Sequence, residues 1–137
     1  MTQEEKQLLL KDLCARLPYG LKINIRDEHS QKMVDDILCA YHIVGISYNL
    51  ESRNPRPYLR PLSSMTEEEE KELKSILREK SFTVDCHNEL IIYTDSEYDC
   101  DHYFSDFYDI QDWLNKKGFD YRGLIPMGLA LEAPRDV

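Results

Sequence analysis

The sequence contains no long apolar run and no closely spaced cysteines, and each absence excludes a class of protein. Its first residues, MTQEEKQLLLKDL, mix acids with a short apolar stretch, which predicts neither a signal peptide nor a membrane span. The four cysteines, Cys14, Cys39, Cys86 and Cys100, form no CxxC pair, so nothing indicates a disulfide framework. We therefore expect a cytoplasmic protein, with Cys14 and Cys39 as small buried hydrophobic residues.

The motifs of common enzyme classes are missing as well. There is no Gly-x-Ser-x-Gly elbow, no Walker loop and no dinucleotide-binding fingerprint among the five glycines. The sequence therefore predicts no catalytic residue and no cofactor. An enzyme is the less favoured interpretation.

Positive charge is missing from one long segment. Residues 81–115 contain nine acids and no Lys or Arg, whereas the rest of the chain contains 17 acids and 17 bases. This segment thus accounts for the whole net charge of −9, and it also holds eight of the fourteen aromatic residues. A pI near 4.9 argues against direct nucleic-acid binding and against binding to anionic membranes, since phosphate contacts need clustered Lys and Arg.

The 137 residues suffice for one domain with its own core, and the patterns predict an α+β fold. We expect about three helices, over 3–16, 67–79 and 106–117, packed on a small, mainly antiparallel sheet. Thr2-x-x-Glu5 and Thr66-x-x-Glu69 are capping boxes that start the first two helices. Gly118 is suited to end the third as a left-handed cap, followed by Phe119.

The strands are less clearly marked. Alternation over 21–26 predicts a half-buried strand, and residues 82–93 predict a hairpin. The run from 32 to 48 fits both periods, but its Ile, Val and Tyr content favours two strands over a helix. Residues 54–61 contain three prolines and predict an irregular connector, which carries part of the Arg53, Arg56 and Arg60 positive patch. We expect residues 95–101 to form a loop or an exposed edge, and the tail to form a helical turn from about 120 to 128.

Two groups of residues resemble metal ligands but fit a metal site poorly. Cys86-His87 and Cys100-Asp101-His102 have the chemistry of zinc ligands, but adjacent residues on a strand point to opposite faces. The alternating acids from Asp95 to Asp101 resemble a calcium loop, yet Cys100 and Asp106 stand where that loop needs Gly and Glu. Packing and a solvated acidic loop are the favoured interpretations, and no metal is predicted.

Three passages carry a resemblance to a known group of proteins. They are LLLKDLCARLPYGLK (8–22), PYLRPLSSMTEEEEKEL (57–73) and DWLNKKGFDYRGLIPMGLALEAP (112–134). Each is similar to signature stretches of small uncharacterised proteins encoded in prophages and mobile elements of gut bacteria. The resemblance implies a genomic setting rather than a chemistry, because that family has no assigned activity. It also implies that the ends are shared scaffold and that the middle is individual to this chain.

The favoured function is a non-enzymatic protein–protein interaction module that docks a basic partner surface. Its candidate binding residues are Asp95, Glu97, Tyr98, Asp99, Asp101, Tyr103, Phe104 and Tyr108. The aromatics would anchor the partner and the acids would steer the encounter. Core packing is the alternative for Phe104 and Phe107, and it is the favoured interpretation of Trp113. One alternative is an acidic DNA mimic that inhibits a nucleic-acid-binding protein. Another is a metal-binding protein or hydrolase that uses the carboxylate, Cys and His groups of 86–102.

Overall fold

The computed structural model describes residues 2–27, 29–47, 54–77, 81–84, 90–93 and 100–134, of which 81–83, 91–93 and 100–107 are described by their backbone alone. Within these ranges the chain has four α-helices and a mixed four-stranded sheet, so the predicted α+β class is confirmed. The helices are α1 (Gln3–Arg16), α2 (Ala40–Ser47), α3 (Glu67–Leu77) and α4 (Cys100–Lys117). The strands are β1 (Lys22–Arg26), β2 (Met33–Ile37), β3 (Arg56–Leu59), β4 (Ser81–Val84), β5 (Leu90–Tyr93) and β6 (Leu131–Glu132).

The chain divides into two compact units, which are described separately. Unit 1 comprises Met1–Leu59 and Leu124–Val137, and unit 2 comprises Arg60–Gly123. Unit 2 is therefore inserted into the sequence of unit 1, and the chain passes between them twice. The expectation of a single domain stays a prediction, since compactness alone does not show whether the two units unfold together.

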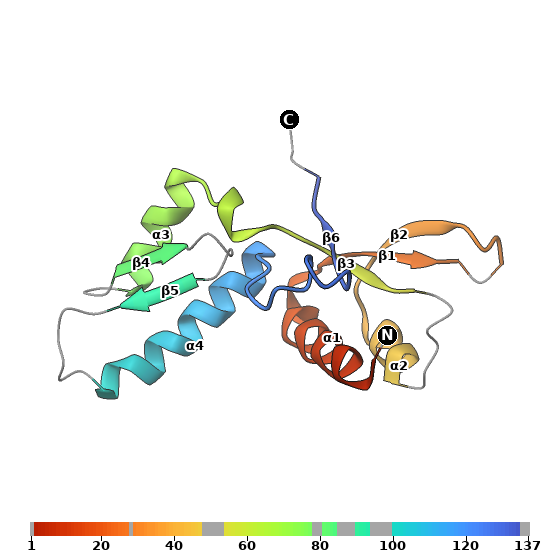
Figure 1. Ribbon diagram of the computed structural model, residues 1–137, viewed down its shortest axis with the longest axis horizontal. Helices are drawn as coiled ribbons and strands as arrows, with labels where there is room; N and C mark the ends of the chain where they lie inside the picture. Colours follow the sequence, from red (N-terminus) through yellow and green to blue (C-terminus); the bar gives the residue numbers. More distant parts are fainter. Residues whose placement is uncertain are drawn as a thin grey trace. The chain divides into compact units, whose positions relative to one another are not determined.

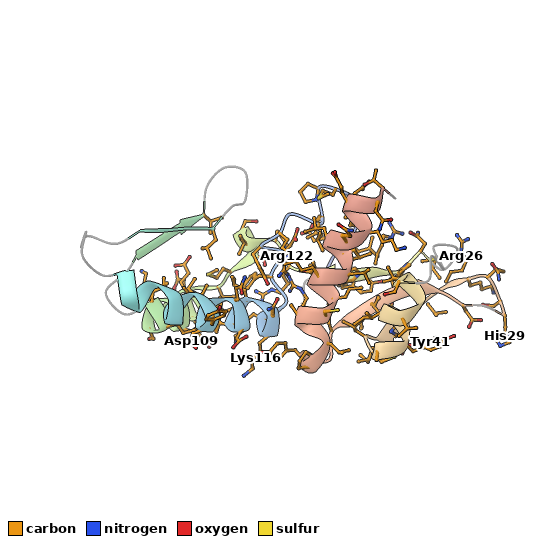
Figure 2. All side chains as sticks on the ribbon, turned by 90° about the horizontal axis from the view of Figure 1, so that it is seen from below. Arg26, His29, Tyr41, Asp109, Lys116 and Arg122 are labelled. Atoms are coloured by element: carbon orange, nitrogen blue, oxygen red, sulfur yellow. The ribbon has the colours of Figure 1, made fainter. Side chains whose placement is uncertain are left out.

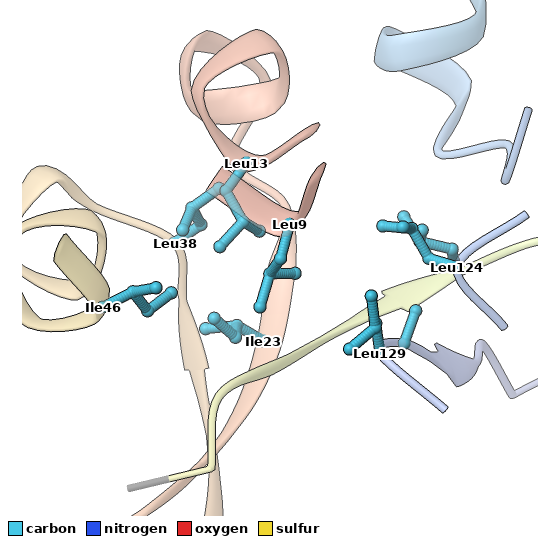
Figure 3. Close-up of a cluster of buried hydrophobic side chains, with 9 residues drawn as sticks. Leu9, Leu13, Ile23, Leu38, Ile46, Leu124 and Leu129 are labelled. Atoms are coloured by element: carbon cyan, nitrogen blue, oxygen red, sulfur yellow. The ribbon is translucent and has the colours of Figure 1, made fainter. Parts of the chain in front are cut away.

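Unit 1 is built on the four-stranded sheet, with strand order β2-β1-β3-β6. β1 pairs antiparallel with β2 and β3, whereas β3 pairs parallel with β6. The helices α1 and α2 lie on one side of this sheet (Figure 1). Between them and the sheet lies a buried cluster drawn in Figure 3, to which the C-terminal tail also contributes: Leu9, Leu13, Ile23, Leu38, Ile46, Leu59, Leu124, Leu129 and Ala130.

The start of α1 was predicted in detail. The backbone N–H of Glu5 donates to Thr2 Oγ1 and the Thr2 N–H donates to Glu5 Oε1, both at 3.1 Å. These two bonds satisfy N–H groups that an uncapped helix start leaves unpaired. The hydrogen bond lowers the pKa of the Glu5 carboxyl below its usual range. The predicted capping box is confirmed.

The interpretation of 32–48 as two strands is only half correct. Its first part is β2, but its second part is the eight-residue helix α2. Tyr41, Ile43 and Val44, which precede Gly45, have a strand-like composition. Burial of Ile46 in the core determines the helical outcome, because tertiary packing overrides weak local propensity.

The predicted irregular connector at 54–61 is also wrong, since residues 56–59 form β3, an inner strand of the sheet. Pro57 lies opposite Ile23 of β1, whereas the pairing with β6 begins at Tyr58. The two ladders are thus staggered along β3. A proline is tolerated inside this strand because it has a registered partner on one side only.

Unit 2 combines α3, α4 and the β4–β5 hairpin. Antiparallel pairing from Ser81↔Tyr93 to Val84↔Leu90 confirms the predicted hairpin. A second buried cluster lies between α3 and α4. Its members are Leu62, Leu73, Leu77, Ile110, Trp113, Leu114 and Phe119. Trp113 stacks on Phe119 with 5.6 Å between the ring centroids, which confirms its predicted place in the core.

The end of α4 has the predicted left-handed cap. Gly118 adopts φ +78°, which glycine reaches without steric cost. The Phe119 N–H donates to the Leu114 carbonyl and the Gly118 N–H to the Asn115 carbonyl, the two bonds of a Schellman motif. The start of α4 differs from prediction, because the helix begins at Cys100 rather than near 106.

The tail turn begins later than predicted. The turn covers 124–128, and the Leu129 N–H donates to the Leu124 carbonyl at 3.0 Å. This turn places Leu124 and Leu129 in the unit 1 core. None of the helices in the described ranges has the length and apolar character needed to cross a membrane.

Candidate functional site

The predicted acidic-aromatic site falls mostly beyond what the structure describes. Asp95, Glu97, Tyr98 and Asp99 lie outside the described residues. Asp101, Tyr103 and Phe104 belong to α4, where the backbone alone is described. The prediction that Asp101 lies in a loop or exposed edge is therefore wrong. The zinc and calcium candidates of 86–102 likewise fall on positions whose side chains are outside the description.

Tyr108 is the one predicted binding residue whose side chain is described. It is 66% exposed, the largest value among the large hydrophobic residues of the described ranges. Asp109 and Asp112 are exposed as well, one and four positions further along the helix. Residues three and four apart share a helix face, so Tyr108 and Asp112 lie together, beside Asp109. In Figure 2, Asp109 and Lys116 lie along one side of α4.

The opposite face of α4 is fixed to α3 by polar as well as apolar contacts. The Trp113 indole N–H donates to Glu72 Oε2 at 3.0 Å, and Lys117 Nζ lies 3.3 Å from the same oxygen. The indole bond, followed by the Lys117 contact, lowers the pKa of Glu72. These contacts define which face of α4 is buried and leave the Tyr108 face exposed.

A second constellation lies in unit 1, where α2 begins. Cys39 directly precedes the helix and is exposed, which corrects its predicted burial; Cys14 is exposed too. Cys39 Sγ lies 3.6 Å from Nδ1 of His42, and the Cys39 backbone N–H donates to the same nitrogen at 3.1 Å. On the other side of the ring, His42 Nε2 lies 3.4 Å from Asp36 Oδ2 of β2. The His42 side chain is almost fully buried between these two groups.

Cys39 and His42 form part of a helix cap. A side chain at the third helical position that accepts the N–H of the preceding cap residue is one half of a capping box. His42 occupies that position and accepts that bond. The contact between Cys39 and His42 therefore has a structural role. The Cys39 thiol lies at one nitrogen of the His42 ring and the Asp36 carboxylate lies at the other.

The open face of the unit 1 sheet carries a third polar group. Asp35 Oδ1 accepts hydrogen bonds from the Tyr58 hydroxyl at 2.7 Å and from Asn24 Nδ2 at 3.1 Å. The Tyr58 bond is the main cause of the lowered pKa of Asp35, and the same bond raises the pKa of Tyr58. These hydrogen bonds join β2, β1 and β3 across the sheet, and they stabilise its strand pairing.

No family model, curated protein or solved structure matches this chain. The resemblance to proteins of prophages and mobile elements stays a prediction.

Two strands over 32–48, as the sequence predicts, do not bring Cys39 beside His42. Residues three apart on a strand point to opposite faces, whereas the first turn of a helix brings them together. The Cys-x-x-His spacing, equal to that of a capping box, was the available signal. Nothing in the sequence signalled Asp36, because its contact depends on β2 lying beside α2.

Proposed function

We propose that this protein is a protein–protein interaction module that docks a basic partner surface on its acidic-aromatic segment. The observation that carries the proposal is the exposure of Tyr108 on one face of α4, beside the exposed Asp109 and Asp112. A tyrosine offers a large contact area with little rotamer entropy to lose, and such residues dominate interface energies.

The charge of the chain supports a basic partner. Unit 2, residues 60–123, contains 16 acids and 8 Lys or Arg, while the rest of the chain contains 10 acids and 9 Lys or Arg. Unit 2, which carries Tyr108, therefore has a net charge of −8 out of the −9 of the whole chain. A field of one sign attracts an oppositely charged protein and accelerates its association.

The other predicted residues belong to the same proposal. Tyr98, Tyr103 and Phe104 would extend the aromatic anchor, and the acids of 95–101 would extend the steering field. The prophage or mobile-element setting and the cytoplasmic location are also proposed, on the resemblance and on the sequence composition respectively.

The test compares two tyrosines of similar exposure. Wild type, Tyr108→Ala and Tyr41→Ala are used to capture proteins from the encoding cell, and the captured partner is then purified for titration. Tyr41 is the matched control because it is 61% exposed but lies on α2 in unit 1 (Figure 2). We expect Tyr108→Ala to weaken binding by tenfold or more, about 1.4 kcal/mol, and Tyr41→Ala to leave it unchanged.

Salt and DNA separate the alternatives. Affinity for a basic partner should fall as ionic strength rises, because the attraction is screened. Asp109→Lys with Asp112→Lys should weaken binding further. Equal affinities of wild type and Tyr108→Ala for the purified partner would refute the proposed surface. Displacement of the partner by duplex DNA would instead favour the DNA-mimic function.

A further inference from the structure

The groups at the start of α2 form a thiol, imidazole and carboxylate in a row. We propose that Cys39 is a nucleophilic thiol that His42 assists as a general base, and that it forms a mixed disulfide with small disulfides. The distances are 3.6 Å from Cys39 Sγ to His42 Nδ1 and 3.4 Å from His42 Nε2 to Asp36 Oδ2. This reactivity is independent of the interaction surface on α4.

The hydrogen bond to the backbone defines the form of the imidazole. Because the Cys39 N–H donates to His42 Nδ1, that nitrogen must carry a lone pair rather than a proton. The ring proton of the neutral form is then on Nε2, which faces the Asp36 carboxylate. Nδ1 is thus unprotonated and lies next to the thiol, as a base must be, and its single lone pair becomes available to the thiol proton when the Cys39 N–H releases it.

The position of the sulfur favours its attack. Cys39 is exposed, so a disulfide can approach it from solvent. It also precedes the first residue of α2, and the positive end of a helix dipole favours negative charge on sulfur. Asp36 stabilises the imidazolium that forms when the thiol proton is transferred, although modestly, since its side chain is 59% exposed.

The reaction balances without a cofactor. The Cys39 backbone N–H releases Nδ1 of His42, and the Cys39 thiol gives its proton to that nitrogen as the sulfur attacks one sulfur of the disulfide. A new S–S bond forms, the old S–S bond breaks, and the leaving thiolate takes the proton back from His42. Cys39 is oxidised and the departing sulfur is reduced to a thiol.

Disulfide exchange fits this site better than other thiol chemistry. Acyl transfer requires donors arranged around an oxyanion in addition to a nucleophile and a base, whereas exchange requires only the thiolate, the base and an open approach. Metal binding fits less well, because Cys39 and Asp36 face opposite nitrogens of one ring and cannot meet at a single ion. No group of three or more potential ligands that could hold a metal occurs among the residues that the structure describes.

The capping role and the chemical role can be separated by one substitution. In His42→Gln the side-chain carbonyl can still accept the Cys39 N–H, as Gln does in a capping box, but it cannot take a proton from the thiol. His42→Ala removes both roles. Cys14 is the matched control thiol, because it is also exposed and lies in the same unit.

The experiment uses the reduced full-length protein with oxidised glutathione as the probe. Peptide mass spectrometry follows the glutathione adducts on Cys39 and Cys14 over time. At pH 7 we expect Cys39 to react about tenfold faster than Cys14. The ratio should shrink above about pH 9, where an ordinary thiol ionises without assistance.

His42→Gln should bring the ratio of the two rates to within about twofold of one while far-UV circular dichroism stays unchanged. If Cys39 and Cys14 react equally fast in wild type, the proposal fails whatever the variants do. It fails as well if a folded His42→Gln protein keeps the wild-type ratio, since His42 would then act only as a cap. If His42→Gln does not fold, the pH dependence of the wild-type ratio decides: a ratio that stays constant from pH 7 to pH 9.5 refutes base assistance.

Discussion

At the scale of single residues, Glu69 of α3 is held by a guanidinium and by a backbone N–H. Its carboxylate accepts two hydrogen bonds of 2.7 Å from the Arg60 guanidinium and one of 3.0 Å from the Thr66 N–H. The same guanidinium lies 4.3 Å above the Phe119 ring. Glu69 therefore caps α3 and also fixes the residue that covers the aromatic core.

We predict that Glu69→Gln destabilises the protein by about 2 kcal/mol at pH 7, because a charge-assisted fork becomes a neutral contact. The Arg60 bonds lower the pKa of Glu69 from 4.5 to about 2. A folded-state pKa below the unfolded one means that the stabilisation is fully present above pH 4.5 and is lost as the pH falls toward 2. Urea unfolding followed by Trp113 fluorescence measures both effects, since Trp113 is the sole tryptophan.

Glu68→Gln is the matched control, because Glu68 is an exposed neighbour on the same helical turn. It should change the stability by less than about 0.5 kcal/mol. An equal loss at Glu68 and Glu69, or a Glu69→Gln deficit that persists unchanged near pH 2, would contradict the role assigned to the fork.

The capping contact between Thr66 and Glu69 could be predicted from the sequence, whereas the paired hydrogen bonds from Arg60 to Glu69 could not. Thr66 and Glu69 match a local pattern whose geometry the helix itself imposes. The sequence places Arg60 in a positive patch of an irregular connector. In the structure its backbone forms a bridge to Phe119, a residue far along the chain, and its guanidinium binds Glu69. Such pairings depend on tertiary structure, which no local spacing encodes.

At the scale of elements, α1 depends on a buried ion pair. Arg16 Nε lies 2.9 Å from Asp12 Oδ2, one helical turn away, and both side chains are fully buried. A buried charge that loses its partner is far more costly than the pair itself is favourable. Asp12→Asn should therefore destabilise the protein by about 3 kcal/mol.

The double change Asp12→Leu with Arg16→Met should cost less than the sum of its two single changes, because it removes both buried charges together. Urea unfolding followed by far-UV circular dichroism of the three variants completes the cycle. Glu4→Gln, on the exposed first turn of the same helix, serves as the control. Additive losses in the cycle would show that the pair is not coupled.

Elements were predictable where a long period matched one structure. α1 has fourteen residues with a capping box, and its bounds followed from the sequence. α2 has eight residues, too few for the helical period to be distinguished from alternation. β3 could not be predicted because it contains Pro57, which lacks a backbone N–H. The strand tolerates this proline because its pairing with β6 begins only at Tyr58.

At the scale of the molecule, the connection between the units bears on whether they unfold together. β3 ends at Leu59, and the next residue, Arg60, forms the bridge to Phe119 in unit 2. The Arg60 N–H donates to the Gly118 carbonyl at 2.7 Å, and the Ala133 N–H donates to the Leu59 carbonyl at 2.7 Å. Leu59 and Arg60 are thus neighbours in the sequence, and the backbone of each is hydrogen-bonded within its own unit.

We therefore predict one cooperative unfolding transition. Leu9→Ala, in the unit 1 core, should destabilise the protein by about 3 kcal/mol, because it leaves a cavity at a fully buried position. Although Trp113 belongs to unit 2, its fluorescence midpoint should shift together with the far-UV circular dichroism midpoint. Calorimetry of the wild type should show a single peak. If Leu9→Ala separates the two midpoints and leaves the Trp113 transition unmoved, the units are independent domains.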